Sequence, residues 1–156
     1  MNVIFLDIDG VLNSRRFFQE ANEWIVQADT RFEYYARQID PECIQRLNAL
    51  VERTGSVVVL SSTWRRVHPL DYNRAFLRAA GFRGVLYDGT PVLNRHPRGD
   101  EIEHWLLGRD ADRVDRFVIL DDDCDMADMA PWHVRTSVET GLVDEDCERA
   151  ERMVMS

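Results

Sequence analysis

The stretch Asn2-Val-Ile-Phe-Leu-Asp7-Ile-Asp9-Gly10 decides the fold class of this chain. It begins with a short, mainly apolar run that contains β-branched and aromatic side chains, which is typical of a strand buried on both faces. Asp7 and Asp9 follow where this strand would end, and Gly10 permits a turn. Because ligands of open parallel sheets bind outside the carboxyl ends of the strands, these aspartates predict a functional site.

Apolar runs and amphipathic segments alternate along the rest of the chain. Strands are predicted over residues 2–6, 56–60, 84–87, 117–120 and 134–138, and helices over residues 41–54, 71–80, 100–107 and 144–154. This alternation predicts a Rossmann-like, three-layer α/β sandwich with a mostly parallel five-stranded sheet. Residues 14–35 contain six aromatic side chains but show no clear period, so we predict an irregular segment there.

The length of 156 residues predicts a single domain, residues 1–156, in which residues 14–39 form a small cap-like insert. Three widely spaced cysteines without a CxxC pair argue against a zinc site and against a disulfide framework. No apolar stretch reaches the roughly 18 residues of a membrane span, and no basic leader precedes the first strand. We therefore expect a cytoplasmic protein with no membrane partner.

All 19 basic residues of the chain are arginines, and lysine is absent. This composition excludes mechanisms that need a Schiff-base lysine, a P-loop lysine or a kinase-type strand lysine. The 28 acidic residues give a net charge of -9, which argues against an extended nucleic-acid footprint. Any cation that holds a phosphate group must therefore be an arginine or a metal ion.

Polar side chains follow three of the predicted strands. The three segments are Asp7-Ile-Asp9-Gly10, Ser61-Ser62-Thr63-Trp64-Arg65 and Asp121-Asp122-Asp123. Neighbouring carboxylates repel one another unless a cation lies between them, and a set of oxygen ligands suits Mg²⁺. Taken singly, each segment has an ordinary structural explanation as a turn or a helix cap. Their joint occurrence at three strand ends predicts a magnesium site.

These segments resemble the motifs of the haloacid dehalogenase-like (HAD) superfamily of phosphohydrolases, and the similarity covers almost the whole chain. Asp7-Ile-Asp-Gly-Val-Leu12 looks like the first motif, Leu60-Ser61 like the second and Asp121-Asp122 like the fourth. A narrower resemblance is to the HAD domain of Swiss Army Knife RNA repair proteins. It rests on residues 7–13, on residues 61–65 and on Arg98-Gly-Asp-Glu-Ile102 with Trp105-Leu106.

The resemblance implies a Mg²⁺-dependent phosphatase that works through an aspartyl-phosphate intermediate. Asp7 would be the nucleophile and a metal ligand, and Asp9 would be the general acid/base whose backbone carbonyl also binds the metal. Asp122 would be the direct acidic metal ligand, with Asp121 or Asp123 assisting it. Ser61 would bind the transferred phosphoryl group.

The superfamily also uses a lysine or arginine that stabilises the charge of the nucleophile and the phosphate. Because lysine is absent, we expect Arg98 to fill this position, with Arg95 as its competitor. An arginine can donate to two phosphate oxygens at once. Further substrate contacts are expected from Gly10, Ser62, Thr63 and Arg65.

The small size of the insert predicts an open, largely capless site, which suits the end of a macromolecule. We therefore expect a phosphatase for 5′ or 3′ phosphate ends of RNA or DNA. The alternatives are a phosphatase for nucleotides or other small phosphomonoesters, and a catalytically idle phosphate-binding module. The aromatic side chains of the insert could stack on a base or pack the insert against the rest of the domain.

Overall fold

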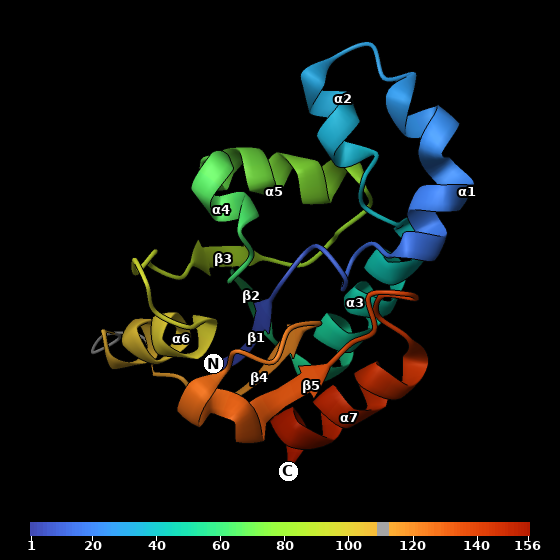
Figure 1. The fold of residues 1–156 in the computed structure, drawn as a ribbon. Coiled ribbons are helices and arrows are strands. Elements are labelled where there is room, and N and C mark those ends of the chain that lie inside the picture. Colours follow the sequence, from blue (N-terminus) through green and yellow to red (C-terminus); the bar gives the residue numbers. More distant parts are fainter. Residues whose placement is uncertain (109–112) are drawn as a thin grey trace.

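A five-stranded parallel sheet forms the centre of the protein (Figure 1). The computed structural model describes residues 1–108 and 113–156. The strands are β1 (Asn2–Leu6), β2 (Val57–Leu60), β3 (Leu86–Gly89), β4 (Arg116–Asp121) and β5 (His133–Arg135). Their order in the sheet is β3-β2-β1-β4-β5, and every neighbouring pair is parallel. The predicted α/β sandwich is confirmed, with β1 as the middle strand.

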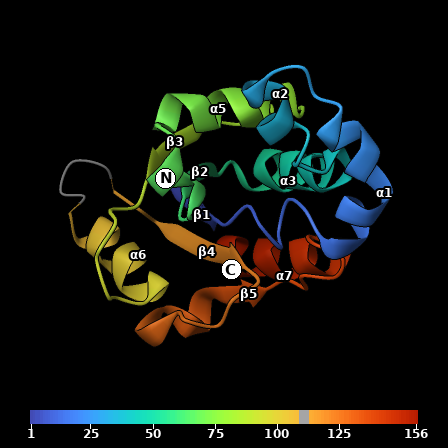
Figure 2. The same ribbon diagram turned by 45° about the horizontal axis from the view of Figure 1, so that its top comes forward.

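Helices cover both faces of this sheet (Figure 2). The longer ones are α1 (Arg15–Val26), α3 (Pro41–Thr54), α5 (Leu70–Ala79), α6 (Arg98–Leu107) and α7 (Asp144–Met155). The shorter ones are α2 (Arg31–Ala36), α4 (Trp64–Val67) and the 3₁₀ helix η1 (Ala127–Trp132). Within the described ranges, none of the helices combines the length and the apolar character needed to cross a membrane.

The side chains of β1 divide between two hydrophobic cores. Ile4 and Leu6 pack into the core that β1 shares with α3, α5 and α7. Val3 and Phe5 point to the opposite face and pack with α6 and the residues of η1. All four side chains have no exposed surface, as predicted for a strand covered on both faces.

The prediction that residues 14–35 are irregular is wrong, because α1 and α2 occupy most of this segment. Their N-termini are capped by the side chains of Ser14 and Thr30, which accept hydrogen bonds from the first turns. Of the residues in these two fully described helices, only Ile25 is buried. The apolar side chains of α1 do recur at helical spacing, at Phe17, Phe18, Ala21, Trp24 and Ile25, so the sequence carried a helix signal that the prediction missed.

The aromatic side chains of α2 pack the insert against α5 and its neighbours. The ring centroid of Phe32 lies 5.1 Å from that of Phe76. Tyr35 lies 5.7 Å from Trp64 and 4.3 Å from His68, again between ring centroids. Figure 1 shows α1 and α2 beyond the carboxyl end of β1, where the polar segments follow the strands. The insert therefore lies next to the edge of the sheet that the sequence marks as functional.

Candidate active site

The topology brings the three polar segments together. β2 and β4 flank β1, and the last residue of β1, Leu6, is in register with Leu60 and Leu120. Backbone hydrogen bonds continue beyond the strand ends, because Asp7 donates its N–H to Leu120 and Ser61 donates its N–H to Leu6. The residues that follow β1, β2 and β4 therefore meet at one edge of the sheet.

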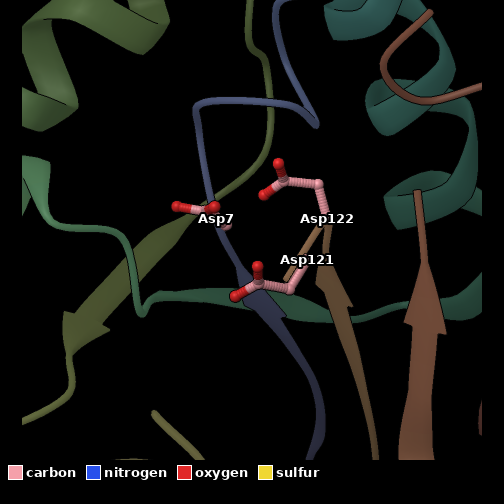
Figure 3. Close-up of side chains that lie close together, drawn as sticks. All are labelled: Asp7, Asp121 and Asp122. Carbon is pink, nitrogen blue, oxygen red and sulfur yellow. The ribbon is translucent and has the colours of Figure 1, made fainter. Parts of the chain in front are cut away.

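Three carboxylates converge at this edge (Figure 3). One ligand oxygen from each of Asp7, Asp121 and Asp122 lies within 4.8 Å of the other two. Burial and the negative charge of Asp121 together raise the pKa of Asp7 to about 8, against the opposing effect of Arg98. A divalent cation would relieve this desolvation and repulsion, and the all-oxygen donor set suits Mg²⁺. The residues present therefore fit the predicted metal.

The two acids at the end of β4, Asp121 and Asp122, differ in their surroundings. Both carboxylate oxygens of Asp121 are engaged within the protein, one by the guanidinium of Arg98 and one by the N–H of Asp123. The carboxylate of Asp122 instead lies against Gly10, where a Cβ atom would come within 2.4 Å of it. Gly10 also has a φ of +81°, so both the turn and the space for Asp122 require glycine. Asp122 thus has the less engaged carboxylate of the pair.

Arg98 is the arginine that the structure brings to the carboxylates. Its Nη1 lies 3.1 Å from Asp7 Oδ1 and 2.5 Å from Asp121 Oδ2. Burial alone would lower the pKa of Arg98, but the two carboxylates outweigh burial and raise it, so the side chain stays charged. Arg95 lies in a turn three residues earlier, with an exposed side chain and a φ of +63°.

The position of Arg98 depends on a close contact between two backbone segments. Gly99 donates its N–H to the carbonyl of Asp125, and Arg98 donates its own N–H to the Asp125 carboxylate. A Cβ atom on Gly99 would lie 1.7 Å from the carbonyl oxygen of Met126. The first turn of α6 therefore touches the segment that follows the acids of β4.

Asp9 lies at the rim of the site with an exposed side chain. Asn13 donates its Nδ2 to one carboxylate oxygen of Asp9 at 2.9 Å, and Trp64 donates its indole N–H to the other at 3.1 Å. Asn13 also accepts the N–H of Gly10. Asn13 and Trp64 stand within the segments that resemble the family motifs, but their contacts with Asp9 were not predicted from the sequence.

The hydroxyl groups after β2 take different positions. Ser62 donates a hydrogen bond to Asp7, which lowers the pKa of that carboxyl, and its oxygen accepts the N–H of Trp64. Within the described chain, the Ser61 hydroxyl is fully buried and has no hydrogen-bond partner. Thr63 is exposed and lines a hollow together with Asp9. The hydroxyl that touches Asp7 thus belongs to Ser62, one residue beyond the serine expected from the resemblance.

Comparison with known families agrees with this arrangement. Residues 3–147 match the family described as the HAD domain in Swiss Army Knife RNA repair proteins. The chain belongs to this HAD family. Membership indicates a hydrolase of the phosphatase type, as the resemblance implied. Searches of curated proteins and of solved structures returned no significant match.

Arg65 of the HAD domain points into the protein. Each of its three guanidinium nitrogens is engaged: Nε by the carbonyl of Thr90, Nη1 by the carbonyls of Ser61 and Ser62, and Nη2 by Glu101. The side chains of Arg65 and Glu101 are only 6% and 3% exposed. This placement does not favour the substrate contact expected from the sequence. Arg65 instead ties the serine segment to α6.

We expect Glu101→Gln to destabilise the HAD domain by about 3 kcal/mol, because it leaves the buried charge of Arg65 without its counter-charge. The measurement is urea-induced unfolding followed by circular dichroism. Glu139→Gln is the matched control, since Glu139 pairs with Arg15 at the surface with 59% of its side chain exposed. The control should change stability by less than about 1 kcal/mol. Equal losses in the two variants would contradict a structural role for the buried pair.

Proposed function

We propose that this HAD domain is a Mg²⁺-dependent phosphomonoesterase that removes the terminal phosphate from 5′ or 3′ nucleic-acid ends. The observation that carries the proposal is the environment of Asp7. Its carboxylate contacts a cation, Arg98, and a hydroxyl, Ser62, and lies next to the carboxylate of Asp122. A nucleophile, two groups that bind phosphoryl oxygens and a metal ligand are thus assembled within one cluster.

In the first step Asp7 attacks the phosphorus atom and forms an aspartyl-phosphate. Arg98 and the hydroxyls after β2 bind the non-bridging phosphoryl oxygens. Without these groups, repulsion between the charge of those oxygens and the carboxylate of Asp7 would oppose the attack. Asp9 gives its proton to the leaving oxygen of the nucleic-acid end. Asn13 and Trp64 hold the two oxygens of Asp9, so they fix the direction in which this proton is delivered.

In the second step the deprotonated Asp9 accepts a proton from a water molecule. That water attacks the phosphorus, the bond to Asp7 breaks and inorganic phosphate leaves. The same carboxylate therefore serves as acid and then as base. Its exposed position at the rim gives water access to it.

The metal site of this proposal is built by the carboxylates of Asp7 and Asp122 together with the backbone carbonyl of Asp9. Mg²⁺ bound there would neutralise charge on the phosphoryl group. Asp121 would act from outside this set, because Arg98 and the N–H of Asp123 already occupy its oxygens. This assigns Asp122 as the direct ligand after β4.

The proposed substrate follows from the size of the insert and from the family. Between β1 and α3, the described chain contains only the helices α1 and α2, so the insert is small. The matching family is described by its occurrence in RNA repair proteins. The net charge of -9 is compatible with the capture of one terminal phosphate but not with an extended grip on a polynucleotide.

We expect Mg²⁺ to be required for phosphate release from phosphorylated oligonucleotides. Removing the metal with EDTA should lower the rate by at least about a hundredfold, and added Mg²⁺ should restore it. The measurement is inorganic phosphate released from 5′- and 3′-phosphorylated oligonucleotides, mononucleotides and p-nitrophenyl phosphate. Faster turnover of mononucleotides than of oligonucleotides would favour a small-molecule phosphatase. No release from any substrate would favour an idle module.

A further inference from the structure

Two hollows adjoin each other on the Asp9 side of the site. The first has a volume of about 220 Å³ and is lined by Asp9, Tyr35, Gln38, Thr63, Trp64, Val67 and His68. The second has a volume of about 420 Å³ and is lined by Arg31, Phe32, Tyr35, Val67, His68, Pro69, Tyr72 and Phe76. Tyr35, Val67 and His68 line both. We call the two together the aromatic groove.

We propose that the aromatic groove binds the terminal nucleoside of the substrate, with its base among the rings of the second hollow. This proposal rests on the proposed function, because that function fixes where the leaving group lies. Asp9 protonates the leaving oxygen, so the leaving group must extend from the phosphate toward Asp9. The groove begins at Asp9 and leads away from it.

The lining of the groove is polar next to Asp9 and aromatic farther away, which is the order of the sugar and the base in a nucleotide. Next to Asp9, the polar side chains of Thr63 and Gln38 suit the hydroxyls of a sugar. Beyond them come the rings of Phe32 and Tyr72, which are 38% and 57% exposed. In a nucleoside the sugar lies between the leaving oxygen and the base, whereas the ring of a phenol is attached directly to that oxygen. The polar part of the groove between Asp9 and the rings therefore fits a nucleoside better than a phenol.

The second hollow has the properties of a base site. Its volume lies within the range of about 300–1,000 Å³ that small-ligand sites occupy. Bases stack on aromatic side chains without a strong preference for sequence. Burial lowers the pKa of His68, and the nearby charge of Arg31 lowers it further, so its ring is neutral at pH 7. Arg31 also supplies a positive charge to the lining, where it lies over the ring of Tyr35.

Contacts within the protein join the groove to the catalytic acid. Trp64 donates its indole N–H to Asp9, and its ring lies 5.7 Å from Tyr35 and 6.0 Å from Phe76. The helix α2, which supplies Phe32 and Tyr35, belongs to the insert. The insert therefore forms one wall of the groove, in addition to packing against α5.

The test compares phosphorylated trinucleotides with the same trinucleotides in which the phosphorylated terminal nucleotide lacks its base. Tyr72→Ala should lower kcat/KM for the complete substrates by about ten- to a hundredfold. It should leave kcat/KM for the abasic substrates unchanged. Trp132→Ala is the control, because Trp132 is 40% exposed and lies in η1, outside the groove. Equal effects of Tyr72→Ala on both substrates, or no effect on either, would overturn the proposal.

Binding to the Asp7→Asn variant separates this proposal from the proposed function. Calorimetric titration with the same trinucleotides should show tighter binding of the complete ones, and adding Tyr72→Ala should abolish that preference. If this pattern appears while the unmodified protein releases no phosphate, the proposed function fails and the groove stands. If phosphate is released but neither the base nor Tyr72 affects rate or binding, the groove fails and the proposed function stands.

Discussion

Asp7→Asn is expected to lower phosphate release by at least about 10⁴-fold, since removal of a catalytic nucleophile typically has an effect of this size. The amide has nearly the same shape as the carboxylate, but it cannot form an acyl phosphate. It also weakens the metal site, because one of the three converging carboxylates is lost. The measurement is the single-turnover rate at saturating substrate and Mg²⁺.

Two controls separate loss of chemistry from loss of fold. Asp128→Asn makes the same chemical change at an exposed acid of η1 and should leave the rate unchanged. Thermal unfolding of Asp7→Asn in EDTA should show a midpoint at least as high as that of the unmodified protein. The reason is that the substitution removes one of two neighbouring buried carboxylates, while Arg98 keeps Asp121 as its partner. Persistence of metal-dependent phosphatase activity in Asp7→Asn would contradict the proposed mechanism.

Arg98→Ala is expected to lower kcat/KM by about 10²–10³-fold, the effect seen when one donor to a developing charge is removed. It should also destabilise the domain, because Asp7 and Asp121 lose the cation between them. Arg98→Lys should recover part of the activity, since an ammonium group keeps the charge but donates from a single point. The measurements are steady-state kinetics and urea unfolding with each variant.

Arg95→Ala is the matched control for this prediction. It removes an exposed arginine only three residues away, from a turn at φ +63°, and should leave kcat/KM and stability unchanged. A larger loss in Arg95→Ala than in Arg98→Ala would show that the phosphate-binding cation has been assigned to the wrong arginine.

The parts of the fold that local rules govern were predictable from the sequence. α3 begins after Asp40, whose carboxylate caps the helix, has Pro41 in its first turn and ends at Gly55 with φ +63°. Each feature acts through the backbone of its own neighbourhood. The convergence of Asp7 with the acids at the end of β4 was predictable for a related reason, since the carboxyl ends of parallel strands share one edge.

Features that depend on packing between distant elements were not predictable in this way. The direction of Arg65 is set by Glu101 on α6 and by the carbonyl of Thr90, neither of which is near it in the chain. Which of the adjacent hydroxyls of Ser61 and Ser62 interacts with Asp7 depends on the path of the backbone after β2, which no periodicity of the sequence records. α1 is different, because Phe17, Ala21 and Ile25 do recur at helical spacing and this local signal was missed.

The contact between Gly99 and the carbonyl of Met126 has a consequence for how the site can be altered. Arg98 and the acids at the end of β4 belong to backbone segments that are in direct contact, so a displacement of one segment would displace the other. A side chain at position 99 would push the first turn of α6 away from the segment at Met126. This displacement would move the cation at position 98 away from Asp7, whether that cation were an arginine or a lysine. The contact between Arg98 and Asp7 therefore depends on glycine, the residue without a Cβ atom, at position 99. Attempts to transplant the site to another scaffold would have to carry the two segments together.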